Sequence, residues 1–406
     1  MKPVGPIPPV FAGQRRLQVG GVDFAELLAR AGDTPAFLYD GAAIAGRVAA
    51  LRAALPPSVG IHYAIKANPH ADVLALIAPL VDGLDVASGG ELAKAIAVKP
   101  ARAVSFAGPG KRDDELAATL EASATLHAES EGEVERTLAI ADRLGLTPRI
   151  AVRVNPDFEL RGSGMRMGGR ASPFGVDAAR VPTLVRHIVA AGADWHGFHI
   201  FAGSQTLDTA ALIETQAATV TLAARLSDAA GYAPAFVNLG GGFGIPYFPG
   251  DTPIDVTAIG VALGDTLAAR DPILSETGFA IELGRYLVGE AGVYCTRVVD
   301  VKRSGDEWFV VVDGGLHHQL AASGNFGTVV RRNYPVALAD RMNADPAITA
   351  SVVGCLCTPL DRLADRIALP AVSVGDTIAI FQAGAYGATA SPQAFLGHPP
   401  ARELLV

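Results

Sequence analysis

Short apolar runs alternate with longer helical patterns through the middle of the chain, from about residue 60 to about residue 290. Each run is rich in β-branched or other apolar residues, ends in polar residues or glycine, and precedes a stretch rich in alanine and leucine. Eight runs follow this rule: 62–65, 83–86, 103–106, 125–128, 149–154, 196–200, 235–239 and 279–283. The helical patterns between them include 90–98, 113–120, 131–144, 177–191 and 208–230. Eight strand–helix units favour an α/β fold with a closed (β/α)8 TIM barrel over an open, doubly wound sheet.

The pattern changes after about residue 285, where helical periodicity becomes scarce. Strand-like runs separated by Gly, Asp and Pro predict a C-terminal, mostly antiparallel β-barrel domain, and they lie at 293–302, 308–313, 350–355 and 377–381. A shorter strand pattern at 16–19 is expected to join it. The predicted organisation is an N-terminal segment of residues 1–32 that joins the β domain, a barrel of residues 33–285, and a β domain of residues 286–406.

Composition limits the classes of function. The 406 residues carry a net charge of −8 and contain no basic tract, which argues against nucleic acid as a partner. No apolar run of about 18 residues is present, so we predict no membrane span and no membrane partner. The proline-rich first residues do not resemble a signal peptide, and three scattered cysteines do not make a disulfide framework. A reducing, cytoplasmic location is the expectation.

The histidines and cysteines do not suggest a metal site. His317 and His318 are adjacent, so in a strand their side chains would face opposite sides. No His-Glu-x-x-His sequence occurs, and Cys355-x-Cys357 has no second pair to complete a zinc site. We therefore predict no bound metal.

The residues that follow each predicted strand would converge at one rim of the barrel, where active sites of this fold lie. Lys66 follows the first strand, and a lysine there would point into the barrel mouth, be partly desolvated and act as a nucleophilic amine. The alternative is a lysine that extends to solvent, which is the commoner arrangement. Gly240, Gly241 and Gly242 follow the seventh strand, where phosphate sites recur, although such a run can also be a flexible turn.

Further candidate ligands stand at the remaining strand ends. Ser204, after the sixth strand, and Arg285, after the eighth, could add contacts to a phosphate. Glu282 could keep a pyridine nitrogen protonated, so that the ring would stabilise a carbanion. A salt bridge between Glu282 and Arg285 is an equally reasonable interpretation from spacing alone.

Taken together, these motifs resemble the fold-type III pyridoxal phosphate (PLP) decarboxylases, the diaminopimelate and ornithine decarboxylase family, over residues 34–390. The most specific segment is Tyr63-Ala64-Ile65-Lys66-Ala67-Asn68, which resembles the family's cofactor-lysine motif. The other matching segments are Asp85-Val86-Ala87-Ser88, Ser172-Pro173-Phe174-Gly175, Gly203-Ser204-Gln205, Leu239-Gly240-Gly241-Gly242, Glu282-x-Gly284-Arg285, Gly354-x-x-Cys357-x-x-x-Asp361 and Gly384-Ala385-Tyr386-Gly387.

The resemblance implies a PLP-dependent carboxy-lyase (decarboxylase) of amino-acid metabolism, built on an alanine racemase-like barrel. Lys66 would carry PLP as a Schiff base, and Glu282 would face the pyridine nitrogen. Cys357 would reach the active site from the partner subunit and reprotonate the substrate carbon, so a homodimer with shared active sites is implied. The other residues expected to bind the cofactor are Asp85, Arg153, His199, Phe201, Ser204, Gly240, Gly241, Gly242, Gly284, Arg285 and Tyr386.

Two departures from the family pattern concern the cofactor ring and the substrate. Phe201 stands where the family usually places a histidine that stacks on the ring, and His199 lies two residues earlier on the same strand face. Thr358 stands where the family has an acid beside its cysteine, and we expect Thr358 and Asp361 to contact the substrate. Because charged partners are missing, we expect a substrate other than diaminopimelate.

The two ends of the chain, residues 1–8 and 391–398, resemble a subgroup associated with exosortase gene clusters. That subgroup is similar in turn to a decarboxylase of glutamyl groups tethered to an acyl carrier protein, so we expect a substrate that is either a small-molecule amino acid or a group bound to an acyl carrier protein. A diaminopimelate decarboxylase proper, a PLP-binding protein without turnover and a lysine-dependent aldolase are the alternatives. The β domain and Cys357 count against the second, and the phosphate cradle counts against the third.

Overall fold

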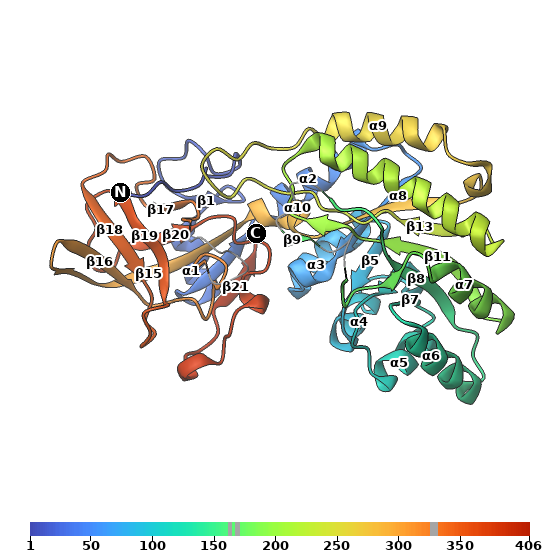
Figure 1. The fold of residues 1–406 in the computed structure, drawn as a ribbon. Coiled ribbons are helices and arrows are strands. Elements are labelled where there is room, and N and C mark those ends of the chain that lie inside the picture. Colours follow the sequence, from blue (N-terminus) through green and yellow to red (C-terminus); the bar gives the residue numbers. More distant parts are fainter. Residues whose placement is uncertain (161–164, 167–170, 325–331) are drawn as a thin grey trace. The chain divides into compact units, whose positions relative to one another are not determined.

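The computed structural model describes residues 1–160, 165–166, 171–324 and 332–406. Contacts group them into two compact units, which Figure 1 traces along the chain. The barrel unit consists of Val48–Ile245 and Pro253–Gly284. The β unit consists of Met1–Arg47, Pro246–Thr252 and Arg285–Val406.

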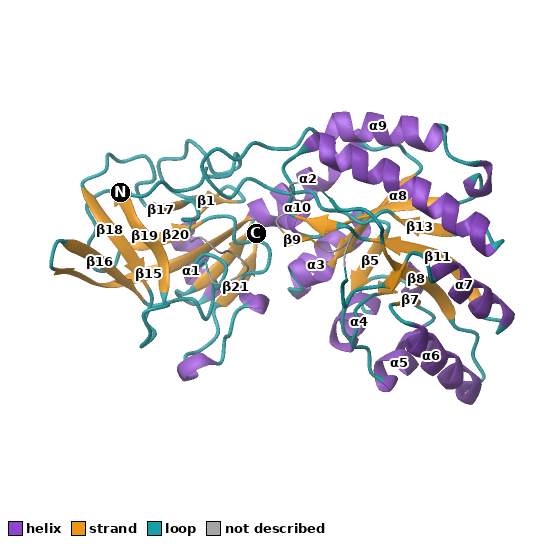
Figure 2. Ribbon diagram, viewed as in Figure 1, coloured by secondary structure: helices purple, strands orange, loops and turns teal. Residues whose placement is uncertain are grey.

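Eight parallel strands close the barrel unit, in the order β4-β5-β6-β7-β8-β11-β13-β14. Figure 2 draws the strands in orange and the helices of this unit in purple. Closure is completed where β14 pairs with β4, with Ile281 opposite Ile61. The strands are β4 (Val59–Ala64), β5 (Gly83–Val86), β6 (Val104–Phe106), β7 (Thr125–Ala128), β8 (Arg149–Asn155), β11 (Asp194–Ile200), β13 (Phe236–Asn238) and β14 (Gly278–Leu283). All eight apolar runs form the strands of this barrel, so the predicted (β/α)8 fold is confirmed.

Helices follow the barrel strands, and α7 and α6 show the local signals that define such helices. In α7, residues Val181, Leu184, Val185 and Ile188 are buried at helical spacing. Ser130 accepts a hydrogen bond from the N–H of Glu133 at the start of α6. The helices with bounds in this unit are α3 (Ala71–Ile77), α4 (Gly89–Ile96), α5 (Asp113–Ala122), α6 (Glu131–Leu144), α7 (Val181–Ala190), α8 (Thr209–Ala230) and α9 (Val256–Ala268).

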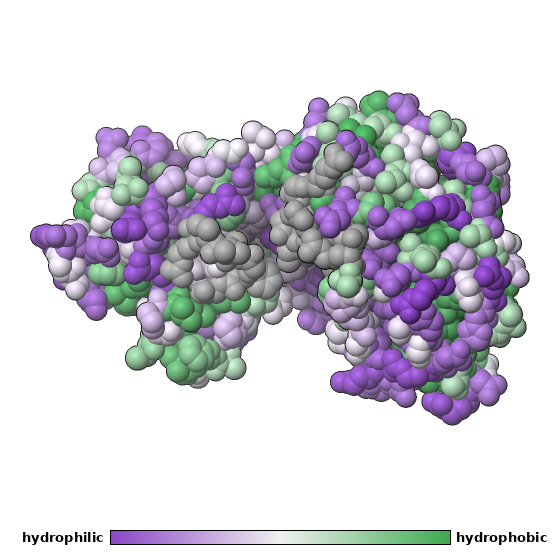
Figure 3. All heavy atoms as spheres, viewed as in Figure 1, coloured by the Kyte–Doolittle hydropathy of each residue, from purple (hydrophilic) through white to green (hydrophobic). Residues whose placement is uncertain are grey.

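The helices α5 and α6 present polar residues on the outside of the barrel unit. Figure 3 shows mainly hydrophilic residues over α5 and α6, whose first turns are acidic. Acidic side chains in the first turn also stabilise a helix, because they lie near the positive end of its dipole. Among the described residues, every helix is too short or too polar to cross a membrane.

A mixed, mainly antiparallel sheet forms the β unit, as expected. Its strand order is β17-β20-β15-β16-β18-β19, and β3 pairs with both β15 and β21. The strands are β3 (Ala36–Tyr39), β15 (Gly292–Ser304), β16 (Glu307–Val312), β17 (Val336–Leu338), β18 (Ile348–Val353), β19 (Arg362–Leu369), β20 (Thr377–Ile380) and β21 (Arg402–Leu405). The N-terminal hairpin of β1 (Gln18–Val19) and β2 (Val22–Asp23) leads into α1 (Phe24–Ala31), and Val19 and Leu27 join its core.

The bounds of the two units and the predicted domain bounds are not the same. The sequence pattern predicts residues 33–47 as part of the barrel, whereas β3 pairs with β15, with Leu38 opposite Val293. Pro246–Thr252 also groups with the β unit. An apolar run indicates a strand but not its partner, because pairing is decided by contacts between segments far apart in the chain.

Candidate active site

A layer of polar side chains lies inside the barrel. His62, Asp85, His127, His199 and Glu282 are all buried, although they stand in strands rich in apolar residues. Successive side chains of a strand point to opposite faces, so their apolar neighbours pack toward the helices while these five face inward. His62 Nδ1 lies 3.4 Å from the Asp85 carboxylate, and the His127 and His199 rings are 4.7 Å apart, centroid to centroid.

Glu282 and His199 form the central pair of this layer. His199 Nε2 lies 2.9 Å from Glu282 Oε2. Burial alone would favour the neutral acid, but the His199 imidazole and the positive charges of Lys66 and Arg153 outweigh it and lower the pKa of Glu282. Glu282 is therefore a buried carboxylate at neutral pH, which can hold a proton on a partner base.

Lys66 lies at the mouth of the barrel, in the 3₁₀ turn Ile65–Ala67 that follows β4. Its Nζ is 6.0 Å from the centroid of the Phe201 ring, which follows β11. The expected partial desolvation is wrong for this chain, because the Lys66 side chain is exposed. The strand end directs the amine out of the packed interior, and its positive charge still helps lower the pKa of Glu282.

Gly284 allows the strand that carries Glu282 to approach the turn that carries Lys66. A Cβ atom at Gly284 would lie 2.9 Å from the Cβ of Ala67 and 3.2 Å from the carbonyl oxygen of Ala64. Real Cβ atoms are essentially never found that close to another side-chain carbon. The glycine therefore brings the ends of β14 and β4 together.

The glycine loop after β13 is fixed against its neighbouring strands. Gly240 has a φ of +70° and Gly242 a φ of +93°, in the left-handed region that favours glycine. The N–H of Gly240 donates to Asn238 Oδ1 at 2.9 Å, and the N–H of Glu282 donates to the Gly240 carbonyl at 2.8 Å. A Cβ at Gly241 would lie 1.9 Å from the Glu282 carbonyl oxygen, so only glycine fits there.

A second loop, after β11, runs beside the glycine loop. The N–H of Thr206 donates to the Gly242 carbonyl at 2.9 Å, and a Cβ at Gly242 would lie 3.0 Å from the Gly203 carbonyl oxygen. Ser204 belongs to the short strand β12 (Gly203–Ser204), and its Oγ is buried without a hydrogen-bond partner in the described part of the chain. An unpaired buried hydroxyl is costly, so this atom is a candidate donor to a ligand oxygen.

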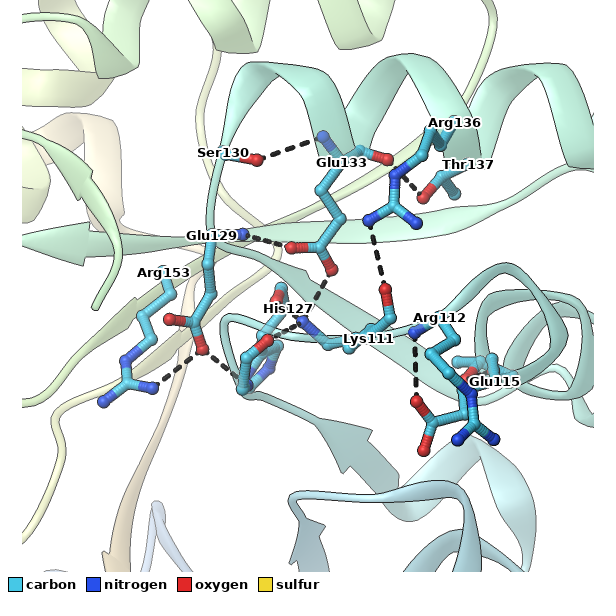
Figure 4. A network of polar contacts seen from close by, with 12 residues as sticks. Lys111, Arg112, Glu115, His127, Glu129, Ser130, Glu133, Arg136, Thr137 and Arg153 are labelled. Carbon is cyan, nitrogen blue, oxygen red and sulfur yellow. Dashed lines mark hydrogen bonds and ion pairs between the residues drawn. The ribbon is translucent and has the colours of Figure 1, made fainter. Parts of the chain in front are cut away.

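Arg153, in β8, is anchored by Glu129, which follows β7 (Figure 4). Its Nη1 donates to Glu129 Oε1 at 2.8 Å, and its guanidinium stacks on Phe174, with Cζ 5.1 Å from the ring centroid. The other oxygen of Glu129 accepts the N–H of Gly175 at 3.1 Å. Arg153 is thus held in place near the polar layer, where its charge helps lower the pKa of Glu282.

A buried lysine stands behind this anchor. Lys111 Nζ donates to Glu133 Oε1 at 2.6 Å, to the Gly108 carbonyl at 2.7 Å and to the His127 carbonyl at 3.0 Å (Figure 4). The N–H of Glu129 in turn donates to Glu133 Oε2 at 3.1 Å. Burial lowers the pKa of Lys111 and raises that of Glu133, and the three close acceptors offset part of the cost of burying the ammonium.

Two residues predicted to bind phosphate lie together in the β unit. Arg285 begins α10 (Arg285–Val288), directly after Gly284 in the chain, and its Cζ lies 4.7 Å from the Tyr386 ring centroid. Its Nη1 donates to the Tyr247 hydroxyl at 2.7 Å. The alternative salt bridge between Arg285 and Glu282 is not found among the described ion pairs, so the arginine keeps guanidinium N–H groups for another acceptor.

The turn after β18 carries the remaining predicted residues. Cys357 is exposed and Thr358 is half-buried, whereas Cys295 in β15 is buried, and all three cysteines are free. Asp361 is buried, and its two carboxylate oxygens accept the N–H groups of Leu316 and Leu356 at 2.6 and 2.8 Å. The contact of Thr358 and Asp361 with substrate stays a prediction.

Sequence reasoning missed part of this site. Lys111, His127 and Glu129 carry no motif, and His62 and His127 could have been found from their inward position in the strand alternation. His199 was expected as a neighbour of the cofactor ring, but its nearest polar partner is Glu282. That contact joins two strands that are far apart in the sequence.

The family model for the pyridoxal binding domain of pyridoxal-dependent decarboxylases matches residues 42–289. The chain belongs to this family. It is 35% identical over 393 residues to the L-glutamyl-[BtrI acyl-carrier protein] decarboxylase of Niallia circulans, covering 95% of this chain and 92% of that relative. It is 31% identical over 398 residues to the diaminopimelate decarboxylase of Aquifex aeolicus, covering 96% and 90%.

A solved structure agrees over nearly the whole chain. The diaminopimelate decarboxylase of M. jannaschii in complex with L-lysine superposes with a TM-score of 0.88 at 25% identity, covering 97% of this chain and 92% of that one. The chain is thus a PLP-dependent decarboxylase with an amino-acid-like substrate, built from a TIM barrel and a β domain.

The residues at the barrel mouth fit PLP. A phosphate needs N–H and O–H donors at close range, and the glycine loop with the unpaired Ser204 hydroxyl offers them. A protonated pyridine nitrogen needs a buried carboxylate, and Glu282 provides it. The aldehyde needs an accessible amine, which Lys66 presents at the same rim.

Proposed function

We propose that this chain decarboxylates a glutamyl-type group carried by an acyl carrier protein, with Lys66 as the PLP-bearing lysine. The observation that carries the assignment of Lys66 is its place at the barrel mouth, in the turn after β4, the strand that pairs with the one that bears Glu282. In this arrangement an accessible amine, a buried carboxylate and a glycine loop stand on neighbouring strand ends.

Each residue then has a definite task. Ser204 and the N–H groups of Gly241 and Gly242 would hold the phosphate, and the family resemblance adds Arg285 and Tyr386 as a charged and a hydroxyl contact. Glu282, kept ionised by His199, would hold a proton on the ring nitrogen. When bound, PLP supplies an electron sink for the electrons of the broken carbon–carboxylate bond.

Cys357 is the proposed acid that returns a proton to the substrate carbon, acting from the partner subunit of a homodimer. Its exposure in the turn after β18 supports this role, because a purely structural thiol would be buried, as Cys295 is. The thiol Sγ gives up its proton and recovers one from water.

The substrate proposal rests on missing charges. Thr358, next to Cys357, offers a hydroxyl rather than a carboxylate. Ala321 and Ala322 stand near the place, after Asp313, where diaminopimelate decarboxylases carry a segment with Arg-Pro. A free diamino acid has a charged distal end that such a site would leave unpaired. In a glutamyl group joined to a carrier, one carboxyl is no longer free, which suits neutral partners. The 35% identity to the glutamyl-carrier decarboxylase supports this choice.

The role of Lys66 is tested by Lys66→Ala. The variant should lose the visible absorbance of lysine-bound PLP and release no carbon dioxide, whereas Lys94→Ala, an exposed lysine on α4, should keep both. Survival of absorbance and activity in Lys66→Ala would mean that another group holds the cofactor.

The substrate is tested by measuring carbon dioxide release from glutamyl-carrier protein, ornithine, lysine and diaminopimelate. We expect turnover of the glutamyl-carrier protein and little of the free diamino acids. Robust turnover of diaminopimelate would overturn the substrate proposal while leaving the assignment of Lys66 intact.

A further inference from the structure

Three side chains of the β unit, His317, Cys355 and His398, form a cluster with the composition of a transition-metal site. Their candidate ligand atoms all lie within 4.8 Å of one another. Cys355 Sγ is 3.9 Å from both ring nitrogens of His398, and the His317 and His398 rings are 5.2 Å apart, centroid to centroid. Nitrogen and sulfur ligands of this kind are preferred by zinc and related divalent ions.

His317 is the residue that points to a ligand. Its side chain is fully buried, with 0% of its surface exposed, and neither ring nitrogen has a hydrogen-bond partner among the residues that the structure describes. Most buried polar groups are paired, so such a ring calls for an explanation. A bound metal would use the lone pair of one nitrogen.

His318, beside it, provides the contrast. The Tyr294 hydroxyl lies 3.0 Å from His318 Nδ1, and the Pro399 carbonyl lies 2.9 Å from His318 Nε2, so both of its nitrogens have protein partners. The two histidines lie in a turn closed by the N–H of His318 on the Gly315 carbonyl, not in a strand. The turn removes one of the reasons for which the sequence pattern excluded a metal, namely that the two side chains would face opposite sides of a strand.

Asp361 fixes two of the three segments against each other. Its carboxylate accepts the N–H of Leu316, next to His317, and the N–H of Leu356, next to Cys355. A Cβ at Gly315 or Gly354 would lie 2.5 or 2.2 Å from that carboxylate, so both glycines allow the approach. The contact of His318 with Pro399 fixes the third segment, next to His398. Preorganisation of this kind is typical of metal sites.

We propose that His317, Cys355 and His398 bind one divalent transition metal of the zinc class, with a fourth position open to water. Ligand atoms of a tetrahedral zinc site are about 3.5 Å apart, given bond lengths of about 2.0 to 2.3 Å. The cluster therefore needs only small side-chain rotations to close on an ion. Binding forms one sulfur–metal and two nitrogen–metal bonds and releases the thiol proton to solvent.

The first test measures zinc binding by the holoenzyme. Protein stripped with a chelator is dialysed against zinc, and bound metal is counted by mass spectrometry. We expect one zinc per chain, and a loss of affinity of more than about a hundredfold in Cys355→Ser and His398→Asn, beyond what removal of an outer partner costs. Cys295→Ala and the surface variant His187→Asn are the matched controls and should bind zinc normally.

The second test identifies the ligands directly. X-ray absorption of the zinc-loaded holoenzyme should show one sulfur at about 2.3 Å and two nitrogens at about 2.0 Å. Cobalt-loaded protein, compared with zinc-loaded protein to cancel the PLP absorbance, should show a thiolate-to-cobalt band that Cys355→Ser abolishes. His317 is fully buried, so His317→Asn is informative only if the variant folds. The test therefore depends on the variants of Cys355 and His398, which are half-buried.

Any of three results would overturn the proposal. Zinc could be absent or far below one per chain, it could bind equally to the ligand variants, or the zinc could have no sulfur neighbour. None of these readouts depends on decarboxylation, so a failure here is distinguishable from a failure of Lys66 or of the proposed substrate.

Discussion

At the scale of single residues, neighbours decide what each group can do. Glu282 stays ionised inside the barrel because His199 lies 2.9 Å away. Lys66 is exposed because it lies in the turn that follows the end of β4. The motif around Lys66 and the Glu282-x-Gly284-Arg285 segment were sufficient to predict these two positions. The His199 contact was not predictable, since nothing in the sequence relates residue 199 to residue 282.

Replacing Glu282 by glutamine should slow carbon dioxide release by about a hundredfold to a thousandfold, because a neutral amide no longer stabilises a protonated ring nitrogen. Rates would be measured on the preferred substrate with PLP loading checked by absorbance. Glu276→Gln, an exposed glutamate just before β14, is the control and should keep the normal rate. A normal rate for Glu282→Gln would remove the carboxylate from the mechanism.

At the scale of elements, the loops and the strand ends determine the site. The alternation of apolar runs and helical patterns was sufficient to predict all eight barrel strands and to place the glycine loop after the seventh of them. It could not show that this loop is bonded to β14 through the Gly240 carbonyl, or that a Lys111–Glu133 pair lies behind Arg153. Both depend on contacts between strands and helices.

Gly241→Ala should weaken PLP binding by about tenfold to a hundredfold, because inserting one carbon into a packed site typically costs about 1 to 3 kcal/mol. The added Cβ would lie 1.9 Å from the Glu282 carbonyl oxygen, so the loop must move. Cofactor titration followed by absorbance measures the effect. Gly132→Ala, on α6 with open space around its Cβ, should bind PLP normally, and equal affinities for the two variants would contradict the role of the loop.

Lys111→Met should lower the free energy of unfolding by about 3 to 5 kcal/mol, because Glu133 is left buried without its cation. Urea unfolding followed by circular dichroism gives the change. The double variant Lys111→Met and Glu133→Leu removes both charges and should recover most of the loss. A double variant as unstable as the single one would show that the packing, not the charge, is at fault.

At the scale of the whole molecule, the proposed function requires two chains. Lys66 belongs to the barrel unit and Cys357 to the β unit, and the family resemblance implies that each active site combines one from each subunit. The assembly is a proposal about partners, and it can be tested without any structure of the dimer.

Mixing Lys66→Ala with Cys357→Ala should restore activity that neither variant has alone. If two sites are shared by a symmetric dimer, random exchange leaves half of the dimers mixed with one intact site each, or roughly one quarter of the normal activity. The measurement is carbon dioxide release after subunit exchange, with each variant mixed with itself as the control. No recovery, in a preparation shown to exchange subunits, would mean that each chain completes its own site.

The sequence by itself determined the barrel, the β domain and the position of Lys66, because strand and helix periods and a local motif are properties of neighbouring residues. Only the tertiary structure decided that β3 joins the β unit, that His199 faces Glu282, and that His317, Cys355 and His398 meet. These are contacts between segments separated by tens to hundreds of residues, and such contacts arise from packing and hydrogen bonding rather than from local pattern.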